Sequence, residues 1–166
     1  MRSIIVHTAL GMLVAAGMPS LAQPPGQCGG QQMRGTWSVS MSGWQTFTAG
    51  PAAGQTAPVV GVAVVVVDYQ GNFTGPGTIV IGGVVNDFEM SGTVEITPEC
   101  TGVLKYAVKV KGSPVPAPGF IERAVFDPKN DQAVTASVQA PAAKPMWIST
   151  IRRLSNQPLP VTWPEL

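Results

Sequence analysis

Residues 86–111 read N-D-F-E-M-S-G-T-V-E-I-T-P-E-C-T-G-V-L-K-Y-A-V-K-V-K, and apolar and polar side chains alternate on both sides of a break at Pro98–Gly102. A period of two residues is typical of a strand with one buried and one solvated face. The break is rich in turn-forming residues. The stretch therefore predicts a β-hairpin with a loop of about five residues.

The charged residues of this hairpin suggest its register. Setting Glu95 opposite Lys105 also sets Glu89 opposite Lys111. The same register pairs apolar residues on the other face: Ile96 with Leu104, Val94 with Tyr106, and Met90 with Val110. A slip of one residue would place apolar side chains against charges, so we expect this register.

Similar short segments follow one another along the chain, separated by turns rich in Gly and Pro. The expected strands are residues 36–42, 59–69, 73–81, 86–97, 103–111, 120–126, 133–139 and 147–154. No segment has a helical period. Antiparallel strands in sequence order predict an all-β, up-and-down meander of about eight strands that closes into a small barrel. A two-sheet β-sandwich is the alternative.

Two segments depart from simple alternation. Residues 59–69 are apolar on both faces, which is typical of a strand covered on both sides. Gly75-Pro76-Gly77 interrupts the next strand, and because Pro cannot donate to a ladder we expect a bulge or an edge position there.

The first 22 residues have the order of a secretory signal peptide: Arg2, an apolar run from Ile4 to Met18, and a small-residue cleavage site ending at Ala22. A membrane anchor is the alternative, but the run is short and broken by Gly and Pro. We expect a signal peptide (1–22), a polar arm (23–32), a barrel domain (33–154) and a Pro-rich tail (155–166). The protein would be exported, periplasmic or extracellular, with no transmembrane span after cleavage.

The residue inventory excludes several kinds of chemistry. His7, the only histidine, lies in the signal peptide, so the mature chain has no histidine for catalysis or for a metal site. Cys28 and Cys100 form an even pair, which in an exported protein predicts a disulfide and leaves no free thiol. Loss of Arg2 takes the formal charge from +1 to 0, which argues against nucleic acid as a partner. We predict no cofactor and no metal.

Three phrases together resemble uncharacterised exported bacterial β-barrel proteins. They are Gly35-Thr36-Trp37-Ser38-Val39, Asp68–Gly75, and Ser91–Val94 with Pro98–Gly102. The relatives have a G-T-Y strand, a D-G-x-G turn and a D-C-T-G hairpin tip, whereas this chain has Trp37 and Glu99 at two of those positions. The resemblance covers residues 33 to 154 and implies a lipocalin-like or allene-oxide-cyclase-like barrel. It implies no activity and no catalytic residues.

Carboxylates remain as the groups that could act in catalysis or metal binding. Asp87 and Glu89 share a strand face and could bind calcium or act as a glycosidase-type pair, but the alternation favours a solvated face paired to Lys111 and its neighbours. Residues 127–131 carry Asp127, Asn130 and Asp131, which form a simple turn more readily than a calcium loop.

The apolar faces of the expected strands give the one positive indication of function. The candidate ligand-binding residues are Trp37, Met41, Phe88, Met90, Val94 and Tyr106. They would line a cavity if the barrel is hollow, or pack its core if it is filled.

Three functions follow. The first, which we favour, is a secreted non-enzymatic barrel that binds a small apolar ligand. The second is a structural or protein-interaction module of the cell envelope, suggested by the Pro-rich tail. The third is a cyclase- or isomerase-like enzyme that uses carboxylates and water, for which the missing histidine is unfavourable.

Overall fold

The computed structural model describes residues 28–129 and 131–162, and the expected signal peptide lies outside them. A short 3-10 helix, η1 (Gly30–Met33), precedes eight strands. The strands are β1 (Gly35–Phe47), β2 (Thr56–Val67), β3 (Asn72–Ile81), β4 (Val84–Ile96), β5 (Thr101–Val110), β6 (Ala117–Asp127), β7 (Gln132–Gln139) and β8 (Ala143–Ser155).

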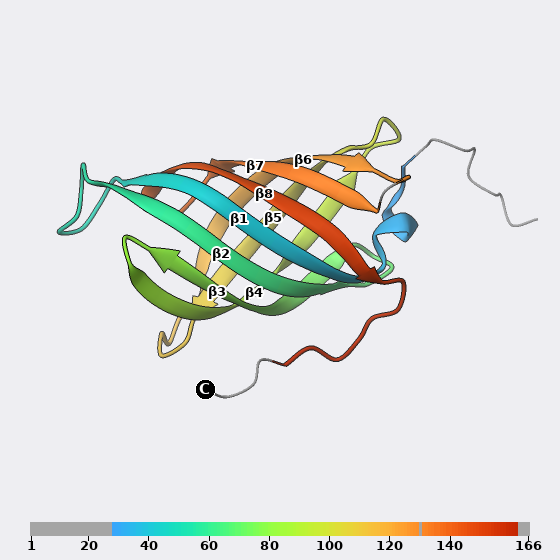
Figure 1. Ribbon diagram of the computed structural model, residues 1–166, viewed down its shortest axis with the longest axis horizontal. Helices are drawn as coiled ribbons and strands as arrows, with labels where there is room; N and C mark the ends of the chain where they lie inside the picture. The colour runs from blue at the N-terminus through green and yellow to red at the C-terminus, as the bar shows by residue number, and fades with distance from the viewer. Residues whose placement is uncertain (1–27, 130, 163–166) are drawn as a thin grey trace, which may run out of the picture.

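The strands form a closed barrel in sequence order, and every neighbouring pair is antiparallel. Pairing of β1 with β8 over residues 36–47 and 143–155 closes the sheet (Figure 1). The predicted all-β meander is therefore confirmed, and the alternative β-sandwich is wrong. One end of the barrel lies beside η1, and the loop of residues 48–55 extends from the other end (Figure 1).

The central hairpin is β4 and β5, but its predicted register is wrong by two residues. Glu95 lies opposite Val103 and Glu89 opposite Lys109. The turn is shorter than expected, because Thr97 donates its N–H to the Thr101 carbonyl at 2.8 Å and strand pairing resumes at once. A slip of two residues keeps every side chain on its predicted face. Lys105 still reaches Glu95 diagonally, with Nζ 3.2 Å from Oε1.

Two strand features differ from expectation. The outer face of β2 is uncovered among the described residues, since Val60 and Val62 are 52% and 50% exposed. The interruption at Pro76 is neither an edge nor a bulge, because the register of β3 with β2 is the same before and after it. Gly75 instead lies so close to β2 that a Cβ there would be 1.9 Å from the Val64 carbonyl oxygen.

The core fills the barrel interior and the end covered by η1. It is built from alternate residues of each strand, including Val39, Val65, Phe73, Leu104 and Ile151, all at most 9% exposed. Phe73 and Phe120 flank the Tyr106 ring, with centroids at 6.2 and 5.1 Å.

The predicted disulfide is present. Cys28, just before η1, is bonded to Cys100 in the turn between β4 and β5. Cys28 also donates its N–H to the Pro98 carbonyl at 3.2 Å. These bonds fix η1 over one end of the barrel.

Replacing both cysteines by alanine should lower the free energy of unfolding. The bond joins residues separated by 72 positions. Loop closure on that scale stabilises by roughly 4 kcal/mol in the chain-entropy model. Urea unfolding of the oxidised protein and the double variant measures the difference. Alkylation of the unreduced, denatured protein is the control, and two labelled thiols would contradict the assignment.

Candidate functional site

The six residues predicted to line a ligand cavity all face the barrel interior. Trp37, Phe88, Met90, Val94 and Tyr106 are buried at 2–8% exposure, and Met41 is half-buried. Five of the six also line one internal void: Trp37, Met41, Met90, Val94 and Tyr106. Phe88 does not line it, because its ring packs on Gly77, where a Cβ would be 2.3 Å from Cζ of the ring.

The internal void is small. Its volume is about 30 Å³, which is close to the share of one water molecule in the liquid. The barrel is therefore largely filled by its own side chains. Binding of a larger molecule in the interior would require its walls to move, and Met33, Met41 and Met90 in those walls have the flexible side chains that adapt most easily.

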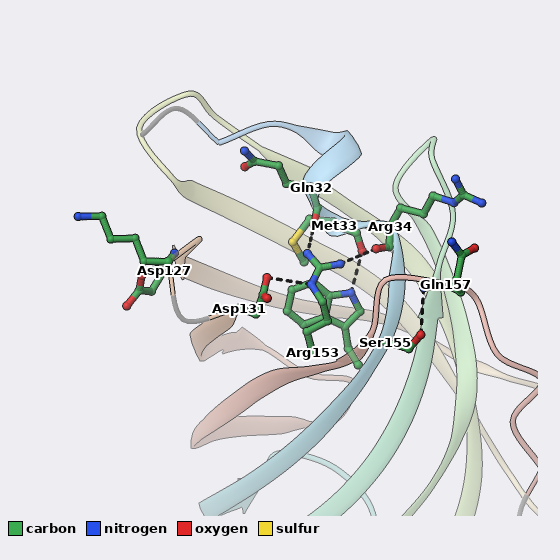
Figure 2. A network of polar contacts seen from close by, with 10 residues as sticks. Gln32, Met33, Arg34, Asp127, Asp131, Arg153, Ser155 and Gln157 are labelled. Carbon is green, nitrogen blue, oxygen red and sulfur yellow. Dashed lines mark hydrogen bonds and ion pairs between the residues drawn. The ribbon is translucent and has the colours of Figure 1, made fainter. Parts of the chain in front are cut away.

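Arg153 on β8 holds η1 in place at the covered end. Its guanidinium lies between Asp131 and the main chain around η1 (Figure 2). Nε donates to Asp131 Oδ1 at 2.9 Å, Nη1 donates to the Arg34 carbonyl at 2.6 Å, and Nη2 donates to the Gln32 carbonyl. The planar fork of arginine suits three acceptors in different directions.

Trp37 lies beneath this guanidinium. The Arg153 Cζ atom is 4.2 Å from the centroid of the Trp37 ring, within the range of a cation–π contact. The indole Nε1 donates to the Met33 carbonyl at 2.7 Å. The first strand, the last strand and η1 are thus joined at one point.

A cleft of about 360 Å³ opens beside this contact. We call it the mouth cleft. Its wall is formed by Cys28, Gln32, Met33, Arg34, Trp37, Ile96, Phe126, Asp127, Pro128, Asp131, Gln132, Arg153 and Asn156. Met33, Trp37 and Phe126 line both the mouth cleft and the internal void. Only these three side chains are common to the two spaces, so they form the wall between the mouth cleft and the internal void.

The barrel interior also holds a carboxylate. Glu122 on β6 is 3% exposed and lines the internal void. Its Oε1 accepts hydrogen bonds from the Tyr106 hydroxyl at 2.7 Å and from Trp147 Nε1 at 3.1 Å. Its Oε2 accepts one from the Thr135 hydroxyl. Hydrogen bonds of this kind offset the cost of burying a carboxylate.

Two further hydroxyl groups lie in the same region. Ser137 is paired with Glu122 across β6 and β7, and Ser149 is paired with Thr135 across β7 and β8. Both hydroxyl oxygens are buried without a hydrogen-bond partner in the described part of the chain. We call this set the interior polar cluster: Tyr106, Glu122, Thr135, Ser137, Trp147 and Ser149.

Burial raises the pKa of the Tyr106 hydroxyl well above its usual value, and the charge of Glu122 and the hydrogen bond to it act in the same direction. Tyr106 therefore remains protonated as the donor to Glu122 at neutral pH. Its phenolate, which could act as a base, is therefore not formed at that pH.

The carboxylates considered from the sequence have local structural partners. Asp87 Oδ1 accepts from the Thr78 hydroxyl at 2.7 Å, and Glu89 is exposed on the outer face. Asp127 Oδ1 accepts the Lys129 N–H at 3.0 Å, and Asp131 is paired with Arg153. Asn130 lies outside the described residues. These contacts are those of strand faces and a turn.

Sequence reasoning missed Glu122 and the rest of the interior polar cluster apart from Tyr106. A signal was present in residues 120–126, where Phe120, Glu122, Ala124 and Phe126 share one face. An acid between two aromatic residues on an apolar face indicates a buried carboxylate. The partners on β7 and β8 gave no such signal, because small polar residues are usually solvent-facing.

Comparison with known proteins gave no result: no family model, curated protein or solved structure matches this chain. Among the described residues, no helix is long and apolar enough to cross a membrane.

The Tyr106 hydroxyl predicts a loss of stability at alkaline pH. Above about pH 10 the unfolded chain loses this proton, while the folded protein retains it because its pKa is raised. Each rise in pH then favours the unfolded chain, by at most about 1.4 kcal/mol per pH unit, until the folded-state pKa is reached.

Urea unfolding from about pH 9 to 11 should show this slope as the difference between the wild type and Tyr106→Phe. Tyr69→Phe is the matched control, since Tyr69 is 69% exposed. Equal slopes in the wild type and Tyr106→Phe would contradict the prediction.

Proposed function

We propose that this protein is an exported, non-enzymatic binding module, lipocalin-like in architecture, that holds a small ligand with an apolar body in its barrel. The mouth cleft is the entry. The observation that carries the proposal is that the mouth cleft and the internal void have Met33, Trp37 and Phe126 as common walls. An apolar group in the cleft would meet apolar side chains all the way to the interior.

The size of the mouth cleft supports this function. Its volume of about 360 Å³ falls within the roughly 300–1,000 Å³ of pockets that bind small molecules. Aromatic and sulfur-containing side chains form part of its wall, and the charged side chains of Asp131 and Arg153 form another part. Such a mixture of apolar walls and a few polar groups is usual for a ligand site.

Export is supported by two observations. The N-terminal sequence has the order of a signal peptide. The disulfide between Cys28 and Cys100 is the kind of bond that persists in an oxidising compartment. A periplasmic or extracellular location is therefore part of the proposal.

Titration with the neutral dye N-phenyl-1-naphthylamine tests the binding function. We expect a saturable rise in dye emission together with a change in tryptophan emission, because Trp37 lies in the wall of the cleft. Gln132→Phe should fill the cleft and lower the affinity for the dye by about tenfold or more, equivalent to about 1.4 kcal/mol of binding free energy.

Gln139→Phe is the matched control. It makes the same substitution at the other end of β7, where Gln139 is exposed and outside the mouth cleft. We expect it to bind the dye as the wild type does. A linear, non-saturating response of the wild type, or equal binding by both variants, would contradict the proposal.

A second function, an interaction module, is favoured by one observation. The outer face of β7 and β8 exposes Val134, Val138, Met146 and Ile148 at 51–58%, and contiguous apolar surface is typical of protein–protein contact sites. If this function holds, sedimentation velocity should show concentration-dependent self-association that Ile148→Lys abolishes. Lys105→Ala, on the polar face, is the control, and a monomer at all concentrations would count against it.

A further inference from the structure

The binary pattern of the chain is inverted over part of β7 and β8, although Ala133, Trp147 and Ile151 on these strands are buried apolar residues. The residues that face the interior there include Thr135, Ser137 and Ser149, while Val134 and Ile148 face outward at 53% and 58% exposure. An antiparallel sheet usually buries the apolar face and solvates the polar one. Such violations of local rules are expected at functional sites. The inversion places polar groups inside the barrel next to Glu122.

Glu122 has no cation as a partner among the described residues. The two ion pairs that these residues form are Lys105 with Glu95 and Arg153 with Asp131. The three donors to Glu122 are two hydroxyls and an indole. The interior thus has an acidic group whose counter-charge the described part of the chain does not supply, and a buried charge is most stable when paired.

The acceptor capacity of Glu122 is incompletely used. A carboxylate offers about four lone-pair sites, and three donors occupy Glu122. The oxygens of Ser137, which is paired with Glu122, and of Ser149, which is paired with Thr135, are buried and unpartnered within the described residues, and Ser149 is 1% exposed. The region therefore offers three acceptors to a group that carries several donors.

We propose that the interior polar cluster binds the protonated primary amine of a slender amphipathic ligand. This inference rests on the proposed binding function and assigns the chemical class of its ligand. An alkylammonium carries three donors, which matches the open site on Glu122 and the hydroxyls of Ser137 and Ser149. Its positive charge supplies the counter-charge that Glu122 lacks.

Other ligand classes match the cluster less well. A carboxylate or phosphate would meet Glu122 as a like charge, and no described residue forms an ion pair with Glu122. A neutral alcohol brings one donor for three acceptors. The apolar part of the ligand is accommodated by the void and by the walls that lead to the mouth cleft, including Met90, Val94 and Phe126.

Three probes of equal chain length test the proposal: octylamine, octan-1-ol and octanoate. Each is titrated by calorimetry into the oxidised full protein at neutral pH, and each competes with N-phenyl-1-naphthylamine. We expect octylamine to bind roughly tenfold or more tightly than octan-1-ol, as for a hydrogen bond to a charged group, and octanoate to bind most weakly.

Glu122→Gln should remove the preference for octylamine over octan-1-ol, because glutamine keeps the shape and loses the charge. Glu89→Gln is the matched control, since Glu89 is exposed on the outer face of β4. It should retain the octylamine preference in full.

A measurement on the wild type avoids dependence on the folding of Glu122→Gln. Trp147 Nε1 donates to Glu122 at 3.1 Å, so its indole N–H resonance should shift with octylamine and much less with octan-1-ol. Trp147→Phe assigns the resonance.

The outcomes separate the two proposals. Equal affinity for octylamine and octan-1-ol, an unmoved Trp147 resonance, or an octylamine preference that survives in Glu122→Gln would overturn the amine assignment while the binding function stands. Failure of the dye and all three probes to bind would overturn the binding function itself.

Discussion

Pairing of β1 with β8 is the contact on which the rest of this structure depends. It runs from Thr36–Ser155 to Phe47–Ala143 and converts a meander of hairpins into a closed sheet. Closure removes the free edges at which a sheet could pair with another chain. It also divides the side chains of each strand between one interior and one exterior. We use parity for the side of a strand to which alternate residues point. Every residue with inward parity is placed inside by closure, whatever its polarity.

That constraint explains why Glu122 is buried. Phe120, Ala124 and Phe126 have the same parity and belong inside, so Glu122 must follow them. An isolated carboxylate in such a place would be very costly. The chain compensates with donors from three other strands, Tyr106 on β5, Thr135 on β7 and Trp147 on β8. The same parity turns Val134 and Ile148 outward, so the interior cluster and the exposed apolar surface have one cause.

The sequence predicted the strand order, the barrel and the disulfide, because each depends on a local signal: alternation, turn residues or an even pair of cysteines. The hairpin register could not be predicted without the turn length. That length depends on Cys100 adopting a φ of 62°, a conformation that non-glycine residues rarely take. The prediction that both faces of β2 are covered was wrong, because apolar residues on both faces do not reveal whether anything covers them.

Five of the six candidate residues line the void, since the alternation shows which side chains face inward. Glu122 and Arg153 could not be assigned in this way, because acids and arginines are usually exposed and their partners lie far away in sequence.

The two ends of the proposed path impose an orientation on any ligand that occupies both. Glu122 lies at the inner end, Trp37 and Phe126 line both spaces, and the charged side chains of Asp131 and Arg153 line the mouth cleft. A molecule with its charged group inward would leave its apolar chain between these aromatic rings. The small volume of the void excludes a bulky body at the inner end unless the methionines move. At the inner end the geometry thus favours a narrow chain over a ring system, and it makes the side chains between the void and the cleft the determinants of ligand length.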